Sequence, residues 1–122
     1  MKKVKIIDHT SPLPAPLKGL FCATFFSRFK GLMFNHDLKE NECIILDEGN
    51  ESIMNTTIHM FFMFFDIAVV WVDRDFKIVD VKLAKKWMPY YAPSHPARYV
   101  LEARPKWVTI FHIGDQLQFY DE

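Results

Sequence analysis

The sequence predicts a mainly β protein, a compact antiparallel β-sandwich or partly closed barrel with one or two short helices. Six or seven short segments are β-branched or alternate between polar and apolar residues, which is typical of strands. Turn-forming residues separate these segments at short intervals, as in all-β folds. Half of the 122 residues are hydrophobic, which is enough for one core, so we expect a single domain over residues 1–122.

The N-terminal half is expected to contain two strands and one short helix. Residues 3–7 are β-branched and predict the first strand. Three alternating prolines make residues 11–17 an extended connector, because proline is excluded from helix interiors and central strands. Residues 23–30 repeat phenylalanine at helical spacing before a glycine, which predicts a short amphipathic helix. Residues 43–46 predict a buried strand, and residues 47–50 have the composition of a turn.

The C-terminal half is expected to be a hairpin followed by two further strands. Residues 67–72 are apolar throughout and residues 77–83 alternate, which predicts an antiparallel hairpin. Its first strand is expected to be buried on both faces and its second on one. The other expected elements are a Pro-rich aromatic loop at 87–93, a strand at 98–102, a helical turn or strand at 107–111, a turn at 113–116 and a strand at 116–120.

Charge and apolar content exclude several classes of protein. Fifteen basic and 15 acidic side chains give a formal net charge of zero, which argues against a nucleic-acid partner. The most apolar stretch, residues 61–72, is too short for a membrane-spanning helix and contains an aspartate. We therefore expect residues 61–65 to lie in the core and the protein to have no membrane partner.

The cysteines and the N-terminus indicate a cytoplasmic protein. Cys22 and Cys43 form no CxxC motif, which favours free thiols in a reducing cell over a disulfide between them. The basic N-terminus is not followed by the apolar segment that a secretory signal requires.

Four local patterns occur in the order and spacing of one family. They are Arg28 to Phe34, Ile58 to Asp73, Ala97 to Glu102 and Ile113 to Asp115. Together they resemble the uncharacterised family known as domain of unknown function 192, over about residues 15–120. The resemblance implies a compact, mainly antiparallel β-sandwich of jelly-roll type, and it implies no assigned reaction.

The chain departs from this family at two places. Family members carry Pro-Ile-Asp or Pro-Leu-Asp where this chain has Asp66-Ile67-Ala68, and a threonine where it has Met60. A role of the family's aspartate is therefore not carried over to this chain.

His59 with Asp66 is one candidate for acid–base chemistry. A histidine held by a carboxylate is the minimal unit of general acid–base catalysis. In a single extended segment the two side chains face opposite sides and lie more than about 20 Å apart, so they meet only across a turn or bulge. The alternative is a histidine satisfied in or near the core, and no catalytic residue is assigned.

Arg98 and Glu102 share a face of the predicted strand, because their separation is even. The favoured interpretation is structural, with Glu102 paired to Arg28 or Arg98. The functional alternative is an Arg98 that binds an anionic ligand through its planar guanidinium.

The loop around Trp87 is the most site-like feature of the sequence. Its aromatic side chains follow two lysines and offer flat apolar faces with a polar handle, which suits stacking on a sugar ring or a partner's side chain. The alternative is that Trp87 closes the open end of the sandwich. The binding residues singled out by the sequence are Trp87, Tyr90, Tyr91, Arg98, His59 and Lys86.

No metal and no cofactor is expected. The five histidines are scattered without HxH or HxxxH spacing, and the cysteines are not paired at ligand spacing. The four glycines do not form a phosphate-binding loop.

Three functions from different classes remain open. The first is a small soluble β-sandwich module that binds an unidentified small ligand or protein partner through an end loop. The second is a structural or assembly protein, with the chain expected to be a monomer or weak homodimer. The third is an enzyme that uses His59 as acid or base, with Asp66 or Glu102 orienting it, and no catalytic signature decides whether the protein is an enzyme.

Overall fold

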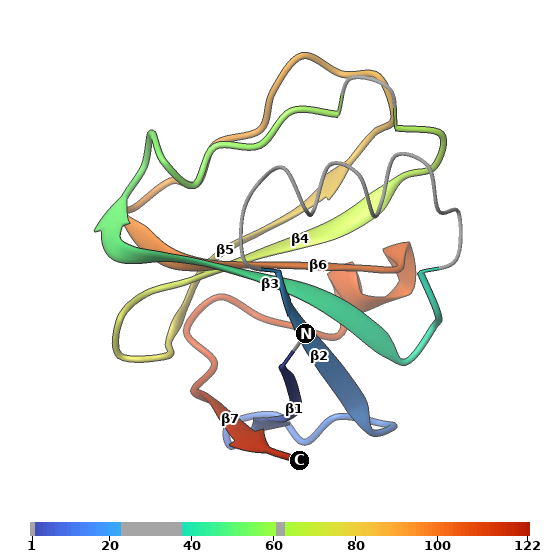
Figure 1. The fold of residues 1–122 in the computed structure, drawn as a ribbon, viewed down its shortest axis with the longest axis vertical. Helices are drawn as coiled ribbons and strands as arrows, with labels where there is room; N and C mark the ends of the chain where they lie inside the picture. The colour runs from blue at the N-terminus through green and yellow to red at the C-terminus, as the bar shows by residue number, and fades with distance from the viewer. Residues whose placement is uncertain (1, 23–37, 61–62) are drawn as a thin grey trace.

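The computed structural model describes residues 2–22, 38–60 and 63–122, which build one seven-stranded mixed sheet (Figure 1). The strand order is β5-β4-β6-β3-β2-β1-β7, with β2 parallel to β3 and the other pairs antiparallel. The strands are β1 (Lys3–Asp8), β2 (Leu17–Cys22), β3 (Glu42–Ser52), β4 (Ile67–Val72), β5 (Ile78–Ala84), β6 (Ala97–Ala103) and β7 (Leu117–Asp121), and a 3-10 helix, η1 (Pro105–Thr109), follows β6.

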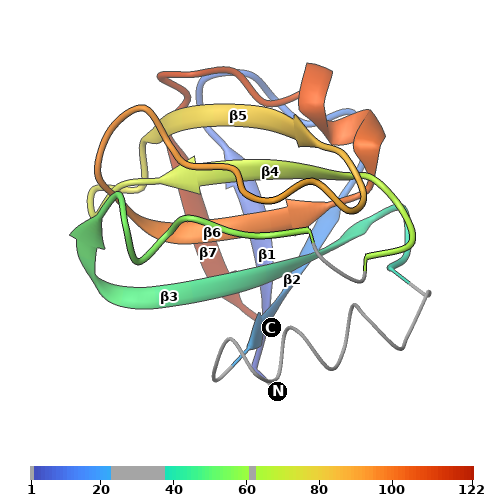
Figure 2. The same cartoon turned by 90° about the horizontal axis from the view of Figure 1, so that it is seen from above.

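The mainly β class predicted by the sequence is confirmed. The sheet keeps two edge strands, β5 and β7, and is not closed into a barrel, although one isolated bridge joins Lys77 to Gln116 between them. Figures 1 and 2 show β1, β2 and β7 turned steeply against β3 to β6, so the sheet curls. The two-layered sandwich and its jelly-roll arrangement stay predictions.

Both faces of the sheet centre are buried, which the apolar run of β4 explains. Alternate β4 residues Ala68, Val70 and Val72 enter one apolar cluster, which also contains Trp107. The intervening residues of β4 enter a second cluster on the other face, together with Met60. The hairpin of β4 and β5 is confirmed, with its first strand buried at every position.

The N-terminal half contains two errors of the sequence analysis, a wrong turn and a missed strand, because tertiary pairing overrode local composition. The turn predicted at 47–50 lies inside β3, where the register with β6 shifts. Gly49 has a φ of 79° and donates its N–H to Asp47 at 2.7 Å, so the turn residues form a bulge there. The second error concerns β2, which the sequence did not indicate. A side chain at Gly19 of β2 would meet the Ile45 side chain, so glycine at this position leaves room for Ile45 to pack over β2.

Other predictions were settled element by element. The alternative at 107–111 resolves in favour of helical structure, since η1 occupies Pro105–Thr109. The helix predicted at 23–30 lies outside the described residues. The core assignment of residues 61–65 was wrong at Phe64, which is 54% exposed and lies before the start of β4, whereas Met63 is buried; residues 61–62 lie outside the described residues.

No helix among the described residues is long and apolar enough to cross a membrane.

The register of the central strands defines two ends of the sheet. Ile67 pairs with Ala84, and Ala68 pairs with Ala103, so the start of β4 lies beside the ends of β5 and β6. We call this the aromatic end, defined by residues 64–66, 85–90 and 104. The opposite end, where β6 begins, is the Arg98 end. Segments 53–60 and 85–96 run side by side over one face of the sheet (Figure 2).

Candidate functional site

The loop after β5 is fastened to the segment before β4 by backbone hydrogen bonds. Ile58 and Tyr91 exchange two such bonds, at 2.9 and 2.8 Å. Met60 receives the Trp87 N–H at 2.9 Å and donates its own N–H to Met88 at 3.1 Å. A loop that sequence composition marks as irregular is therefore held in one position.

Trp87 is held in a backbone conformation that its side chain disfavours. Its φ is 67°, in the left-handed region that bulky residues rarely adopt. Two side chains fix the chain just before it. The Tyr91 hydroxyl accepts the Lys85 N–H at 2.9 Å, and the Asp66 carboxylate accepts the Lys86 N–H at 2.9 Å. Strain of this kind, about 1–3 kcal/mol, gathers at binding and catalytic sites.

Four large apolar side chains are exposed at this end. The exposed fractions are 54% for Phe64, 47% for Trp87, 47% for Met88 and 68% for Tyr90. The Phe64 and Trp87 rings meet edge to face, with centroids 5.8 Å apart. Contiguous apolar exposure at one place is a feature of interaction sites, whereas single exposed apolar residues are ordinary.

The other two tryptophans show what a structural tryptophan looks like in this fold. Trp71 and Trp107 are completely buried. Their indole N–H groups donate to the carbonyls of Thr56 at 2.7 Å and Glu40 at 2.6 Å. Trp87 differs in exposure and in backbone conformation.

A shallow hollow of about 340 Å³ lies next to Phe64. It is lined by Phe64, Phe65, Asp66, Lys86, Arg104 and Pro105. The Asp66 carboxylate lies 3.6 Å from the Lys85 ammonium. Within the described part of the chain, the charged groups of Lys86 and Arg104 make no ion pair or side-chain hydrogen bond. Among the described residues, the hollow therefore presents two positive charges without an ion-pair partner beside apolar walls.

The residues predicted from sequence divide into two groups. Lys86, Trp87, Tyr90 and Tyr91 lie together on the fastened loop. His59 lies alongside them, half-buried between two residues whose backbones pair with this loop. Their binding role stays a prediction.

Arg98 does not join this group. It lies at the opposite end of β6, where its guanidinium donates to both Asp47 oxygens at 2.9 and 3.1 Å. The pairing proposed between Arg98 and Glu102 is therefore replaced by one across to β3. Glu102 itself is fully buried at the centre of the sheet. Arg28, its other proposed partner, lies outside the described residues.

Sequence reasoning also missed a buried pair of acids. Asp8 at the end of β1 and Asp115 before β7 are both almost completely buried. Ser11 contacts both, donating its N–H to Asp8 at 3.0 Å and its hydroxyl to Asp115 at 3.5 Å. Burial, followed by the neighbouring Asp115 carboxyl, raises the pKa of Asp8 above its ordinary value. No sequence signal links these residues, because they are more than 100 positions apart.

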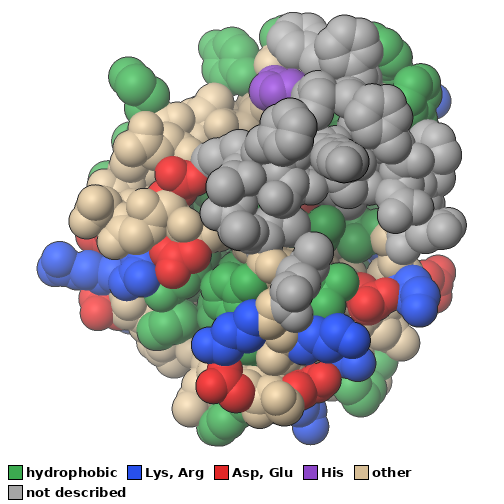
Figure 3. Space-filling view, in the orientation of Figure 1, with side chains coloured by type: hydrophobic (Ala, Val, Ile, Leu, Met, Phe, Trp, Pro, Cys, Tyr) green, Lys and Arg blue, Asp and Glu red, His purple; other side chains and the backbone are tan. Residues whose placement is uncertain are grey.

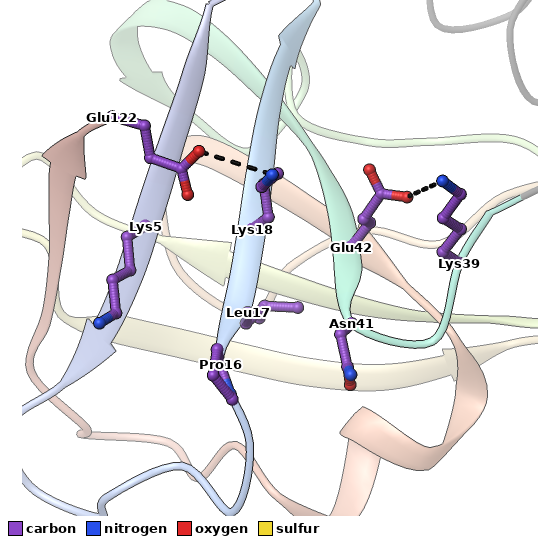
Figure 4. A pocket seen from close by; sticks show the side chains of 8 residues that line it. All are labelled: Lys5, Pro16, Leu17, Lys18, Lys39, Asn41, Glu42 and Glu122. Carbon is purple, nitrogen blue, oxygen red and sulfur yellow. Dashed lines mark ion pairs between the residues drawn. The ribbon is translucent and has the colours of Figure 1, made fainter.

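A second cavity, of about 520 Å³, lies over β1, β2 and the start of β3 (Figure 4). Its charges are largely compensated from within, since Lys18 lies 3.6 Å from Glu122 and Lys39 lies 4.0 Å from Glu42. Figure 4 shows Lys5 pointing away from this first pair. Figure 3 likewise shows basic and acidic side chains intermingled over this lower part of the molecule. The hollow at the aromatic end differs in that its two cations, Lys86 and Arg104, make no ion pair within the described residues.

The described residues do not form a metal site or a site with a reactive thiol. No three His, Cys, Asp or Glu side chains there are grouped as metal ligands. Cys43 is a free, buried thiol, and burial raises its pKa, so it stays protonated. The side chain of Cys22 is outside the described set.

These features define a class, a small mainly β protein that exposes aromatic and basic side chains at one end of a single sheet. The family model of domain of unknown function 192, described as "Uncharacterized ACR", matches residues 15–119. The chain belongs to this family of unknown function, as the sequence resemblance indicated.

Archaeal relatives agree with this assignment. UPF0127 protein TK1120 of Thermococcus kodakarensis is 42% identical over 97 residues, covering 80% of this chain and 60% of the relative. A UPF0127 protein of Thermococcus gammatolerans is 43% identical over 79 residues, covering 65% of this chain and 50% of the relative. The chain thus spans about half to three-fifths of the length of these relatives.

Two crystal structures share the fold. One is that of a "putative transcription regulator" from Sinorhizobium meliloti, with a TM-score of 0.80 and 18% identity, over 97% of this chain and 92% of that protein. The other is a protein of unknown function from Novosphingobium aromaticivorans, with a TM-score of 0.74 and 18% identity, over 95% of this chain and 83% of that protein. At this identity the likeness concerns the fold alone.

Proposed function

We propose that this protein is a binding module that holds a polypeptide segment of a protein partner on its aromatic end. The observation that carries the proposal is Trp87, a bulky residue kept in a left-handed conformation with about half of its side chain in solvent. Phe76 shares this backbone conformation but packs against the Tyr99 ring, whereas Trp87 presents its side chain to solvent. Strain that presents an aromatic side chain to solvent supports a binding role.

The surrounding side chains favour a macromolecule over a small molecule. Small-molecule sites are concave and enclose most of the ligand. Here three exposed apolar residues, Trp87, Met88 and Tyr90, lie within four positions of the sequence. The hollow beside Phe64 is shallow. Tryptophan, tyrosine and methionine are also the residues enriched at the centres of protein interfaces.

The geometry gives less support to acid–base chemistry at His59. One of the two carboxylates expected to orient it, Asp66, accepts the Lys86 N–H at 2.9 Å and lies 3.6 Å from the Lys85 ammonium. Asp66 therefore serves the loop that carries Trp87. An acid stands at this position in place of the family's proline, so the function of the loop is expected to differ among family members.

The proposal is tested by selecting peptides from a phage-displayed random library on the purified protein. Selected peptides should bind the parent protein and lose at least about tenfold in affinity on Trp87→Ala or Tyr90→Ala, since interface aromatics often contribute above 1.4 kcal/mol. Tyr120→Ala is the matched control, because Tyr120 is 44% exposed but lies on the edge strand β7. Its variant should bind like the parent.

Two outcomes would overturn the proposal. One is that no peptide is enriched. The other is that the enriched peptides bind Trp87→Ala as well as they bind the parent, with both proteins folded by circular dichroism. Sedimentation of the unliganded protein tests a third outcome. If the protein is a dimer and Trp87→Ala makes it a monomer, a second copy of the chain occupies the aromatic end. That result would also contradict a foreign partner.

A further inference from the structure

The register of the sheet brings charged residues of three separate segments together at the aromatic end. Asp66 precedes β4, Lys85 and Lys86 follow β5, and Arg104 follows β6. The pairing of Ile67 with Ala84 and of Ala68 with Ala103 places these positions around the start of β4. The cluster is therefore a consequence of strand pairing, and residues far apart in the sequence supply it.

The charges of this cluster are not balanced. Asp66 is compensated by Lys85, whose ammonium lies 3.6 Å from its carboxylate. Lys86 and Arg104 both line the hollow, and their charged groups have no counter-ion in the part of the chain that the structure describes. Elsewhere in the fold, Arg98 and Lys18 are paired with carboxylates, at 2.9 and 3.6 Å.

The residues that line the hollow favour one kind of anion, a carboxylate. Arg104 offers a planar fork of donors that matches a carboxylate, and Lys86 adds a second cation. The Asp66 carboxylate also lines the hollow and repels a second negative charge, which disfavours a phosphate dianion. Phe64, Phe65 and Pro105 supply apolar walls for a group attached to the anion.

We infer that this hollow is a carboxylate-binding subsite, in which Arg104 and Lys86 bind a carboxylate of the partner while its adjoining apolar side chain packs against Phe64. The inference rests on the proposed function and deepens it, since it names the partner's anchor as an acidic residue, or a chain terminus, next to an apolar one. Trp87 and Phe64 are in ring contact, so the subsite and the aromatic surface are continuous.

The inference is tested by NMR titration of the parent protein with N-acetylphenylalanine and with its neutral amide. The acid should bind at least about tenfold more tightly than the amide, and raising the salt concentration should weaken only the acid. Phenyl phosphate, offered as the dianion, should bind more weakly than the acid. Arg104→Gln or Lys86→Gln should remove the preference for the acid over the amide.

Arg98→Gln is the matched control, because it removes the same group from the other end of the same strand. It should leave the preference unchanged. Equal binding of acid and amide to the parent, a phosphate that binds more tightly than the acid, or an unchanged preference in both Arg104→Gln and Lys86→Gln would each overturn the subsite.

Failure of this inference is distinguishable from failure of the proposed function. If selected peptides require Trp87 but N-acetylphenylalanine and its amide bind equally well, the proposed partner surface is supported and the carboxylate subsite is contradicted. If N-acetylphenylalanine binds in an Arg104-dependent way while no peptide is selected, the subsite stands and the polypeptide partner falls.

Discussion

The two ends of β6 carry the same residue type in opposite circumstances. At one end, the Arg98 guanidinium is bound by both Asp47 oxygens and lies 4.9 Å from the Tyr99 ring centroid. At the other end, Arg104 lines a hollow and has no counter-ion in the described ranges. The cause is the neighbouring strands. Asp47 of β3 pairs with Tyr99, next to Arg98, whereas Ala103, next to Arg104, pairs with the uncharged residues Cys43 of β3 and Ala68 of β4. An arginine is structural or available according to the side chains that neighbouring strands place beside it.

The largest expected effect is a difference in the free energy of unfolding between variants of a buried tryptophan and of the tryptophan at the aromatic end. Trp107→Ala removes a fully buried side chain whose N–H is bonded to Glu40, and should lower the free energy of unfolding by about 3–5 kcal/mol. Trp87→Ala removes a half-exposed side chain and should lower it by about 1–2 kcal/mol. Urea unfolding measures both. Equal losses would mean that Trp87 is part of the core.

The next effect isolates the strain at Trp87. Glycine adopts a positive φ without penalty and alanine does not, so Trp87→Gly should be more stable than Trp87→Ala by about 1 kcal/mol. Tyr90 is the control, because it is not among the described residues with positive φ, and there alanine should be the more stable replacement. If alanine is also better at position 87, the strain argument fails, whatever the binding result.

The smallest effect contrasts the two arginines. Burial acts to raise the pKa of Asp47, but hydrogen bonds from Arg98 and from the Gly49 N–H outweigh it and hold the pKa below its ordinary value of 3.8. A lowered pKa in the folded state contributes stability above about pH 3.8, and this contribution is lost as the pH falls through the folded-state pKa.

Arg98→Ala should therefore lower the free energy of unfolding by about 0.5–1 kcal/mol at pH 7, and the loss should shrink by pH 3. Arg104→Ala should change it by less than about 0.5 kcal/mol at either pH. Denaturation of both variants at the two pH values decides the matter. A loss at Arg104 that matches the loss at Arg98 would show that Arg104 is a structural residue too.

The sequence predicted the scaffold better than it predicted the site. The β4–β5 hairpin and β6 were predictable because alternation and apolar runs are local signals. The loop around Trp87 was also identified, from its aromatic and proline content. By contrast, β2 was missed because its place depends on parallel pairing with a distant strand.

The charged part of the candidate site was identified only in part, because the sequence singled out Lys86 but not Arg104. Arg104 and Asp66 meet at one hollow only through the register of β4 and β6, which a single sequence does not reveal. Phe64 was assigned to the core because it lies in a phenylalanine-rich run, yet the sheet begins only at Ile67. Composition identifies apolar residues but not which of them are exposed, since Met63 in the same run is buried and Phe64 is not.

The most direct measurement is an NMR titration that follows the three indole N–H signals during binding of a selected peptide. Trp71 and Trp107 are buried and donate theirs to backbone carbonyls, so they serve as internal references for the scaffold. Trp87 reports on the aromatic end. Binding there predicts that the Trp87 signal shifts with peptide concentration while the other two stay in place. A Trp87 signal that does not move while the peptide binds, or a shift confined to Trp71 or Trp107, would contradict the assignment of this end as the binding surface.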